Sequence, residues 1–194
     1  MNIILASKSP RRQELLGLIT NDFTVVTADV DERAIEEKLA GTAPKKLAEE
    51  LAKAKAIAVF EKLGRPEDTI VIGADTSVID GDQIMGKPAD KEDALRMLTS
   101  LSGHKHSVIT GVCLVSSTGV HAFAEEAFVE FNSLDEYQQA LIKRYCDSTE
   151  PYDKAGAYGI QGGGALLVKG IEGDFFNVVG LPVSRLAREM DALN

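Results

Sequence analysis

The amino-acid sequence predicts an α/β fold, because short apolar runs typical of buried strands alternate with amphipathic helical patterns. Ile3 to Leu5 and Ile70 to Ile72 are two such runs, and Leu47 and Leu51 recur at the spacing of one helix face. The chain has 194 residues, of which 44% are hydrophobic and 26% are charged. This length and composition suit one sizeable globular domain, residues 1–194, with room for two lobes.

Composition also limits the classes of partner. The formal net charge of −9 argues against a nucleic acid polymer as partner, because such binding needs a basic surface. A small anionic ligand is compatible with this charge if basic side chains gather locally and a divalent cation assists. The two cysteines, Cys113 and Cys146, have neither zinc-site nor disulfide spacing. With no signal-peptide pattern and no apolar run of membrane-spanning length, we expect a reduced, cytoplasmic protein without a membrane anchor.

The first strand leads directly into a helix start that carries two arginines. Ser9 is the expected N-cap and Pro10 suits the first helical position. Arg11 and Arg12 follow at the end of the helix that already favours anions, so their positive charges oppose the helix dipole unless an anion binds there. This conflict predicts a phosphate site. A capped helix with two solvated arginines is the alternative, and this stretch alone leaves both open.

A second strand is expected at Phe23 to Val26, followed by a polar loop through Glu32, and Thr42 to Pro44 opens a long helix. Its predicted buried stripe consists of the residues that recur at helical spacing: Leu47, Leu51, Ala54 and Ala58. Lys55 lies about 40° around the helix from Leu51 and should therefore point inward. The alternative is a lysine that extends along the apolar face into water.

Asp75 follows a buried strand and two small residues, Gly73 and Ala74. Ligands in open α/β sheets gather beyond the carboxyl ends of strands, so a carboxylate at this position is well placed for chemistry. A turn aspartate is the alternative. Thr76 to Ile79 continues as strand, however, and Asp80–Gly81 already supplies a hairpin turn.

The second half of the sequence predicts a helix, a long two-stranded ribbon, and a second helix capped by Ser133 with Glu136 in a capping box. His104 and His106 are two residues apart, but no third ligand lies nearby, so we expect surface histidines and no zinc site. The expected elements are a helix at Ala89 to Leu101, strands at Ser107 to Ser116 and Val120 to Phe131, a helix at Leu134 to Arg144, a hairpin of Leu166 to Val168 with Phe175 to Val179, and a helix at Leu181 to Met190.

The most glycine-rich segment is AGAYGIQGGGA, from Ala155 to Ala165. It lacks the Lys-Ser/Thr ending of a Walker loop and the glycine spacing of dinucleotide-binding motifs. Its backbone can still approach a ligand closely, and Gln161 is the one amide side chain in the segment that could read the edge of a base.

Four motifs together, LASKSPRRQELL, IGADTSVI, GKP and DKAGAYGIQGGGALLV, resemble those of the Maf family in content and order, and they span nearly the whole chain. The resemblance implies a Maf/HAM1-like fold, in which an elongated mixed β-sheet is flanked by helices and a central cleft separates two lobes. It implies a nucleoside triphosphate pyrophosphatase that uses a divalent metal cation, Mg²⁺ or Mn²⁺, and that commonly forms a homodimer.

The resemblance also implies roles for individual residues. Asp75 matches the aspartate that activates water, and Glu32 matches the acidic residue that would join it in holding the metal. The family's phosphate-binding residues match Ser7, Arg11, Arg12, Lys55 and Lys87. The positions linked with substrate choice match Arg11, Thr76 and Gln161, and this combination resembles the subgroup that prefers dTTP and UTP. Adjacent helical residues point about 100° apart, so we expect Arg12 at the phosphates and Arg11 nearer the selecting end.

Two other classes remain open from the sequence. A nucleotide-binding regulator of cell division would need the anion site without hydrolysis. A nucleotide phosphatase or a sugar-phosphate enzyme could use the same anion site but would release orthophosphate in place of pyrophosphate.

Overall fold

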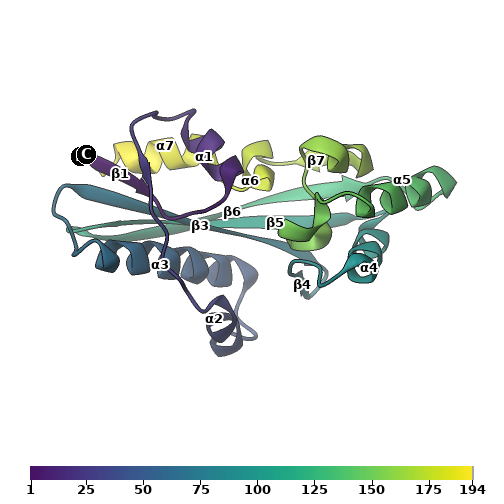
Figure 1. Ribbon diagram of the computed structural model, residues 1–194, viewed down its shortest axis with the longest axis horizontal. Helices are drawn as coiled ribbons and strands as arrows, with labels where there is room; N and C mark the ends of the chain where they lie inside the picture. The colour runs from purple at the N-terminus through teal and green to yellow at the C-terminus, as the bar shows by residue number, and fades with distance from the viewer. Residues whose placement is uncertain (194) are drawn as a thin grey trace. The chain divides into compact units, whose positions relative to one another are not determined.

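The computed structural model describes residues 1–193 and has one mixed sheet flanked by helices (Figure 1). Within these residues the sheet has seven strands in the order β2-β1-β3-β5-β6-β7, with β4 paired to β3. β1 is parallel to β2 and β3, whereas the β3–β4 and β6–β7 pairs are antiparallel. The strands are β1 Asn2–Leu5, β2 Thr24–Val25, β3 Thr69–Asp80, β4 Gln83–Met85, β5 Lys105–Ser116, β6 Gly119–Phe131 and β7 Val168–Glu172. The predicted α/β class with a mixed sheet is confirmed.

The described residues also form seven α-helices and three short 3₁₀ helices. The α-helices are α1 Pro10–Leu16, α2 Glu32–Lys38, α3 Pro44–Lys62, α4 Lys91–Leu101, α5 Glu136–Cys146, α6 Phe175–Val179 and α7 Val183–Asp191. The 3₁₀ helices are η1 Pro151–Asp153, η2 Ala155–Ala157 and η3 Gly162–Leu167. None of the helices in residues 1–193 combines the length and the apolar character that crossing a bilayer requires.

The chain forms two compact units, to which β3, β5 and β6 each contribute residues. Unit 1 consists of Met1–Thr76, Thr110–Glu125 and the residues from Gly180 onward, and unit 2 consists of Ser77–Ile109 and Glu126–Val179. The single domain of residues 1–194 and the central cleft stay predictions.

In unit 1, helices cover both faces of the sheet, with α3 on one face and α1 and α7 on the other (Figure 1). α3 approaches the sheet closely at two glycines. A Cβ atom on Gly73 would lie 2.2 Å from the carbonyl oxygen of Ala52, and one on Gly111 would lie 2.2 Å from that of Ala48. The side of α3 that meets the strands is therefore built from small residues.

The predicted buried stripe of α3 is partly wrong. Leu47 and Leu51 are buried as expected, but Ala54 and Ala58 are only half-buried. The small residues in the core are instead those that pack beside the two glycines, Ala48, Ala52 and Ala56. Helical spacing from the leucines alone could not reveal this shift, because it depends on how closely the sheet backbone approaches.

The polar loop expected around Glu32 is in fact the start of a helix. α2 begins at Glu32, and the carboxylate of Asp31 accepts a hydrogen bond of 3.0 Å from the amide of Ala34. None of its seven residues is buried, so it has no apolar periodicity to detect. The cap at Asp31, an acidic first turn and Lys38 in the last turn were the available signals.

In unit 2, the prediction for one of the two histidines, His106, and the predictions for two elements need correction. His106 is 2% exposed and lies in an aromatic cluster with Phe131 and Tyr158, so it is a core histidine, whereas His104 lies at the surface as predicted. The cap of α5 is Asp135, whose carboxylate accepts from the amide of Gln138 at 2.8 Å, and not Ser133.

The closing hairpin predicted at Phe175–Val179 is also wrong, because this apolar run forms the short helix α6. The side chain of Asp174 accepts from the amide of Phe176 at 2.8 Å and so supports the first turn. β7 pairs with β6 instead. A five-residue apolar run carries no periodicity that separates a strand from a helix.

Candidate active site

The candidate site in unit 1 lies where β1 ends and β3 continues. Leu5, the last residue of β1, is paired with Ile72, and the amide of Ala6 makes a final hydrogen bond to the carbonyl of Ile72. β3 runs on without a break through Asp75, so the prediction that Asp75 follows the end of its own strand is wrong. It lies instead just beyond the carboxyl end of the parallel neighbour β1, which is where ligands gather in such sheets.

Asp75 and Lys55 form the tightest charged contact of this site. Lys55 Nζ lies 2.6 Å from Asp75 Oδ1 and 3.1 Å from Glu32 Oε2. The side chains of Lys55 and Asp75 are 17% and 13% exposed, and that of Glu32 is 50% exposed. The prediction that Lys55 points inward is confirmed. One amine therefore holds the carboxylates of β3 and α2 together.

Glu36 adds a third carboxylate to this region, and sequence reasoning missed it. Burial raises its pKa, and the negative charges of Asp75 and Glu32 raise it further. Glu36 lies one helical turn after Glu32 on α2, so an i, i+4 pair of acidic residues was the available signal.

Arg12 is held by three acceptors, one nearby in the sequence and two from distant parts of the chain. Its Nε donates to the carbonyl of Gly180 at 2.9 Å, Nη2 donates to Thr76 Oγ1 at 3.0 Å, and Nη1 donates to Ser7 Oγ at 3.4 Å. Burial lowers the pKa of Arg12, and nearby Arg11 lowers it further while Asp75 opposes the shift. Each terminal nitrogen keeps an N–H group without a partner in the described part of the chain.

Ser7 and Arg11 complete the helix start. Ser7 is buried, and its hydroxyl accepts from the amide of Ser9 at 3.2 Å. Ser9 is the N-cap residue as predicted, with Pro10 first in the helix, but its side chain makes no capping hydrogen bond. Arg11 is half-buried. Arg12, the arginine expected at the phosphates, donates a hydrogen bond to Thr76, one of the residues expected to select the substrate.

The acidic cluster and Arg12 lie on different faces of the sheet. Asp75 and Thr76 are successive residues of β3, so their side chains point to opposite faces. Asp75 meets Lys55 of α3 on one face, and Thr76 meets Arg12 of α1 on the other. Because β1 stops before this point, both groups border the same open stretch of β3.

Thr110 is a polar residue at this site that sequence reasoning missed. It lies on β5, is fully buried, and its Oγ1 is 2.9 Å from Thr76 Oγ1. Thr110 belongs to a long apolar run of the sequence, so no motif or charge marked it.

Two of the predicted site residues, Lys87 and Gln161, belong to unit 2, and both are exposed. Lys87 follows β4, and the carbonyl of neighbouring Gly86 accepts a 3.0 Å hydrogen bond from the amide of Gly156. The turn that carries Lys87 is thereby tied to the glycine-rich segment that carries Gln161. Their roles toward a ligand stay predictions.

The segment around Gln161 is pinned by side chains of unit 2. Tyr145 Oη accepts from the amide of Gly159 at 3.3 Å, and Glu150 Oε2 accepts from the amide of Gly163 at 3.1 Å. His106 Nε2 lies 2.7 Å from Tyr158 Oη, and both rings are buried. These contacts fix the backbone on each side of Gln161.

The donor set suits a hard divalent cation shared with a ligand. Across residues 1–193, no three or more His, Cys, Asp or Glu side chains gather into a group that could hold a metal ion. Asp75 and Glu32 bring two carboxylates to one amine. One or two carboxylates together with substrate phosphates is a common Mg²⁺ environment. These residues therefore fit the group that the sequence predicts.

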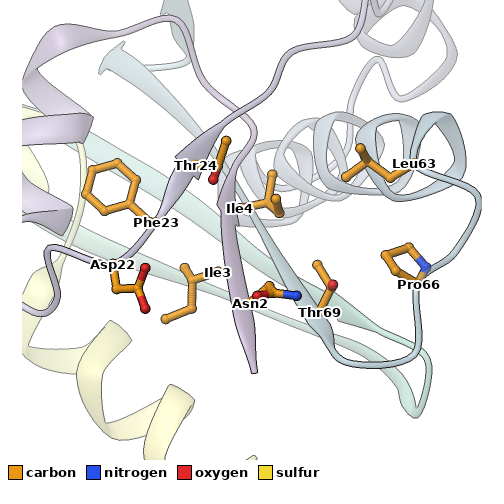
Figure 2. Close-up of a pocket in the computed structure, with 9 residues that line it drawn as sticks. All are labelled: Asn2, Ile3, Ile4, Asp22, Phe23, Thr24, Leu63, Pro66 and Thr69. Carbon is orange, nitrogen blue, oxygen red and sulfur yellow. The ribbon is translucent and has the colours of Figure 1, made fainter.

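A separate hollow in unit 1, of about 270 Å³, opens at the amino ends of β1 and β3 (Figure 2). Its polar side chains are those of Asn2, Asp22, Thr24 and Thr69. Asp75 lies on β3 beyond the other end of β1, so this hollow is distinct from the candidate active site.

Comparisons with known proteins agree with the sequence motifs. The family model described as Maf-like protein matches residues 2–193. A dTTP/UTP pyrophosphatase of Thermosipho africanus is 47% identical over 96% of this chain and 90% of its own. One of Ruminiclostridium cellulolyticum is 45% identical over 100% of this chain and 96% of its own. Among solved structures, the Ham1 protein of Staphylococcus aureus matches with a TM-score of 0.55 at 14% identity and 100% coverage of both chains, which confirms the expected fold.

Proposed function

The chain belongs to the Maf family, and on that premise we propose that it is a nucleoside triphosphate pyrophosphatase that hydrolyses dTTP and UTP. The products are the nucleoside monophosphate and pyrophosphate. Relatives at 44–47% identity carry the name of this enzyme, which favours hydrolysis over a purely regulatory nucleotide-binding role.

One observation carries the assignment of chemistry to residues: Lys55 joins the carboxylates of Asp75 and Glu32 beside the end of β1. Lys55 Nζ donates to Asp75 Oδ1 and leaves the second carboxylate oxygen available. Asp75 is the proposed base. It takes a proton from the water whose oxygen attacks the α-phosphorus, while the bond from that phosphorus to the bridging oxygen breaks and pyrophosphate leaves with the electron pair.

An aspartate side chain ordinarily has a pKa of about 3.9 and is a weak base at neutral pH. Asp75 and Glu32 would hold a divalent cation, Mg²⁺ or Mn²⁺, which would offset the charge of the phosphates and make water a better nucleophile. Lys55 holds the two carboxylates beside each other. This arrangement lets an acidic protein bind a highly charged anion.

The remaining basic residues act on the phosphates. Arg12 is fixed by Gly180, Thr76 and Ser7 and offers its other N–H groups to phosphate oxygens. Arg11, Lys55 and Lys87 add positive charge, and the Ser7 hydroxyl adds a hydrogen bond. Arg11, Thr76 and Gln161 are the proposed substrate-selecting residues.

We also propose that the enzyme is cytoplasmic and forms a homodimer.

A product assay with one matched pair of variants tests this proposal. The wild-type protein with Mg²⁺ or Mn²⁺ should release pyrophosphate from dTTP and UTP faster than from other canonical triphosphates. Asp75→Asn should lower that rate by at least about 100-fold, because it removes the general base. Asp82→Asn, which changes an exposed turn aspartate, is the control and should match the wild type.

Far-ultraviolet circular dichroism of Asp75→Asn separates a catalytic defect from unfolding, and a wild-type spectrum is expected. Orthophosphate as the product of the wild-type protein would contradict the reaction. Wild-type turnover by Asp75→Asn would contradict the role of this residue.

A further inference from the structure

The hydroxyl of Thr76 has two partners in unit 1, and both are fixed. Arg12 Nη2 lies 3.0 Å from Thr76 Oγ1, and the Oγ1 atom of Thr110 lies 2.9 Å from it. Thr76 is half-buried and so can reach a ligand, whereas Thr110 is fully buried and cannot.

Counting donors and acceptors limits what Thr76 can still offer. A hydroxyl has one hydrogen to donate and two lone pairs that accept. A guanidinium only donates, so Arg12 occupies one lone pair of Thr76. Thr110 then occupies either the other lone pair or the hydrogen. In both cases Thr76 keeps a single capacity, either to donate or to accept.

The arginine on the other side of Thr76 has little freedom to move. Arg12 is also held through Nε by the carbonyl of Gly180 at 2.9 Å. Gly180 closes over the pair, because a Cβ atom built there would lie 3.5 Å from Thr76 Oγ1 and 3.7 Å from Arg12 Nε. The capacity that Thr76 keeps therefore depends on Thr110.

We propose that Thr110 is a positioning residue for substrate selection, whose hydrogen bond decides whether Thr76 offers a donor or an acceptor to the base of the nucleotide. This inference rests on the proposed function and on the proposed role of Thr76 in it. The relevant chemistry is that of pyrimidines: thymine has an acceptor carbonyl at C4, as does uracil, where cytosine has an amino donor. A hydroxyl that can only donate, or only accept, a hydrogen bond distinguishes these bases. A hydroxyl that can do both binds either base.

Two substitutions of Thr110, one without the hydroxyl and one with it, test the proposal. Thr110→Val removes the hydroxyl and keeps the branched side chain, and Thr110→Ser keeps the hydroxyl. The measured quantity is the ratio of kcat/KM for UTP to kcat/KM for CTP. Thr110→Val should lower this ratio about tenfold, the effect of roughly one hydrogen bond, and Thr110→Ser should keep the wild-type ratio. Thr110→Ala also lacks the hydroxyl and replaces Thr110→Val if that variant does not fold.

A double-mutant cycle separates action through Thr76 from a general packing effect. If Thr110 acts through Thr76, Thr76→Val alone and Thr76→Val/Thr110→Val should have the same UTP to CTP ratio. Independent, additive effects of the two substitutions would overturn the proposal, and so would a wild-type ratio in Thr110→Val or in Thr76→Val. A wild-type protein that releases no pyrophosphate from UTP would instead refute the proposed function itself.

Discussion

At the scale of single residues, Lys55 is the side chain on which the candidate site depends most. It contacts Asp75 and Glu32, carboxylates that belong to a strand and a different helix. Without its charge these carboxylates would face each other and nearby Glu36 uncompensated. Removing one partner of such a pair usually costs more stability than the pair itself provides.

We therefore expect Lys55→Met to affect both stability and activity. The free energy of unfolding at pH 7 should fall by about 1–3 kcal/mol, because a partly buried carboxylate loses its charged hydrogen bond. The rate of pyrophosphate release from UTP should fall about 100-fold or more. Urea unfolding and a pyrophosphate assay measure the two effects. Lys53→Met on the same helix is the control, because among the ion pairs of residues 1–193 Lys53 contacts only Glu50, at 3.8 Å. Its free energy of unfolding should stay within about 0.5 kcal/mol of the wild-type value. Equal behaviour of the two variants would contradict the role of Lys55.

His106 is the second residue with a measurable consequence. Burial lowers its pKa from the ordinary 6.5 to about 4. Its Nδ1 has no hydrogen-bond partner within the described chain, and Nε2 contacts Tyr158 Oη. The folded protein therefore holds this imidazole neutral at pH values where the unfolded chain protonates it.

This shift predicts the direction of a pH effect. As pH falls below about 6.5, His106 binds a proton in the unfolded state, but in the folded state it stays neutral until about pH 4. The free energy of unfolding therefore falls across this window. The loss attributable to His106 should approach about 3 kcal/mol. Urea unfolding at pH 7 and pH 4.5 measures it, with His106→Gln expected to weaken the pH dependence and the exposed His104→Gln expected to keep it. The same slope in all three proteins would show that His106 is not the cause.

At the scale of elements, the position of α3 decides where Lys55 lies. α3 meets β3 and β5 at Gly73 and Gly111, whose missing side chains leave room for the helix backbone. The alanines of α3 pack at this contact, and Lys55, on the same side of the helix, donates a hydrogen bond to Asp75.

A methyl group at this contact should therefore be costly. Gly111→Ala places a Cβ atom 2.2 Å from backbone atoms of Ala48, so the helix must shift, and the free energy of unfolding should fall by about 3 kcal/mol. Gly170→Ala on β7 is the control, because a Cβ atom there would meet nothing within 4 Å. Thermal unfolding of both variants measures the difference. A stable Gly111→Ala protein with wild-type activity would contradict this account of how α3 is placed.

Elements with clear periodicity were predictable from the sequence, and elements without it were not. The strands around Ile70, Val112 and Val129 and the helix around Leu51 carry the apolar patterns of buried elements. α2 has no buried residue, and α6 is an apolar run of five, so neither has a period to read.

The site could be predicted from sequence only where charge or a motif marked it. Asp75, Lys55 and Arg12 stood out because charged groups on apolar or helix-start positions need an explanation. Thr110 and His106 could not be recognised, because their partners, Thr76 and Tyr158, are more than thirty residues away along the chain. Contacts across such separations depend on strand pairing that no local pattern specifies.

At the scale of the whole molecule, the proposed function requires an acidic chain with a formal net charge of −9 to bind an anionic substrate through a few local cations and a metal. Lys55 supplies a counter-charge for Asp75 and Glu32 from within the chain. The fold should therefore not depend on the metal, even though the proposed reaction does.

Metal removal tests this separation. A chelator such as EDTA should abolish pyrophosphate release from UTP, and added Mg²⁺ or Mn²⁺ should restore it. The unfolding temperature of the protein without nucleotide should be unchanged by the chelator. A large fall in that temperature would show instead that the metal is part of the folded structure.

The proposed function depends above all on attack by water at the α-phosphorus of dTTP or UTP. Hydrolysis of UTP in H₂¹⁸O, followed by mass spectrometry of both products, tests it most directly. Attack at the α-phosphorus forms the new bond to the monophosphate and breaks the bond to the leaving pyrophosphate. One ¹⁸O atom is expected in UMP and none in pyrophosphate. The label in pyrophosphate would place the attack at the β-phosphorus and contradict the mechanism.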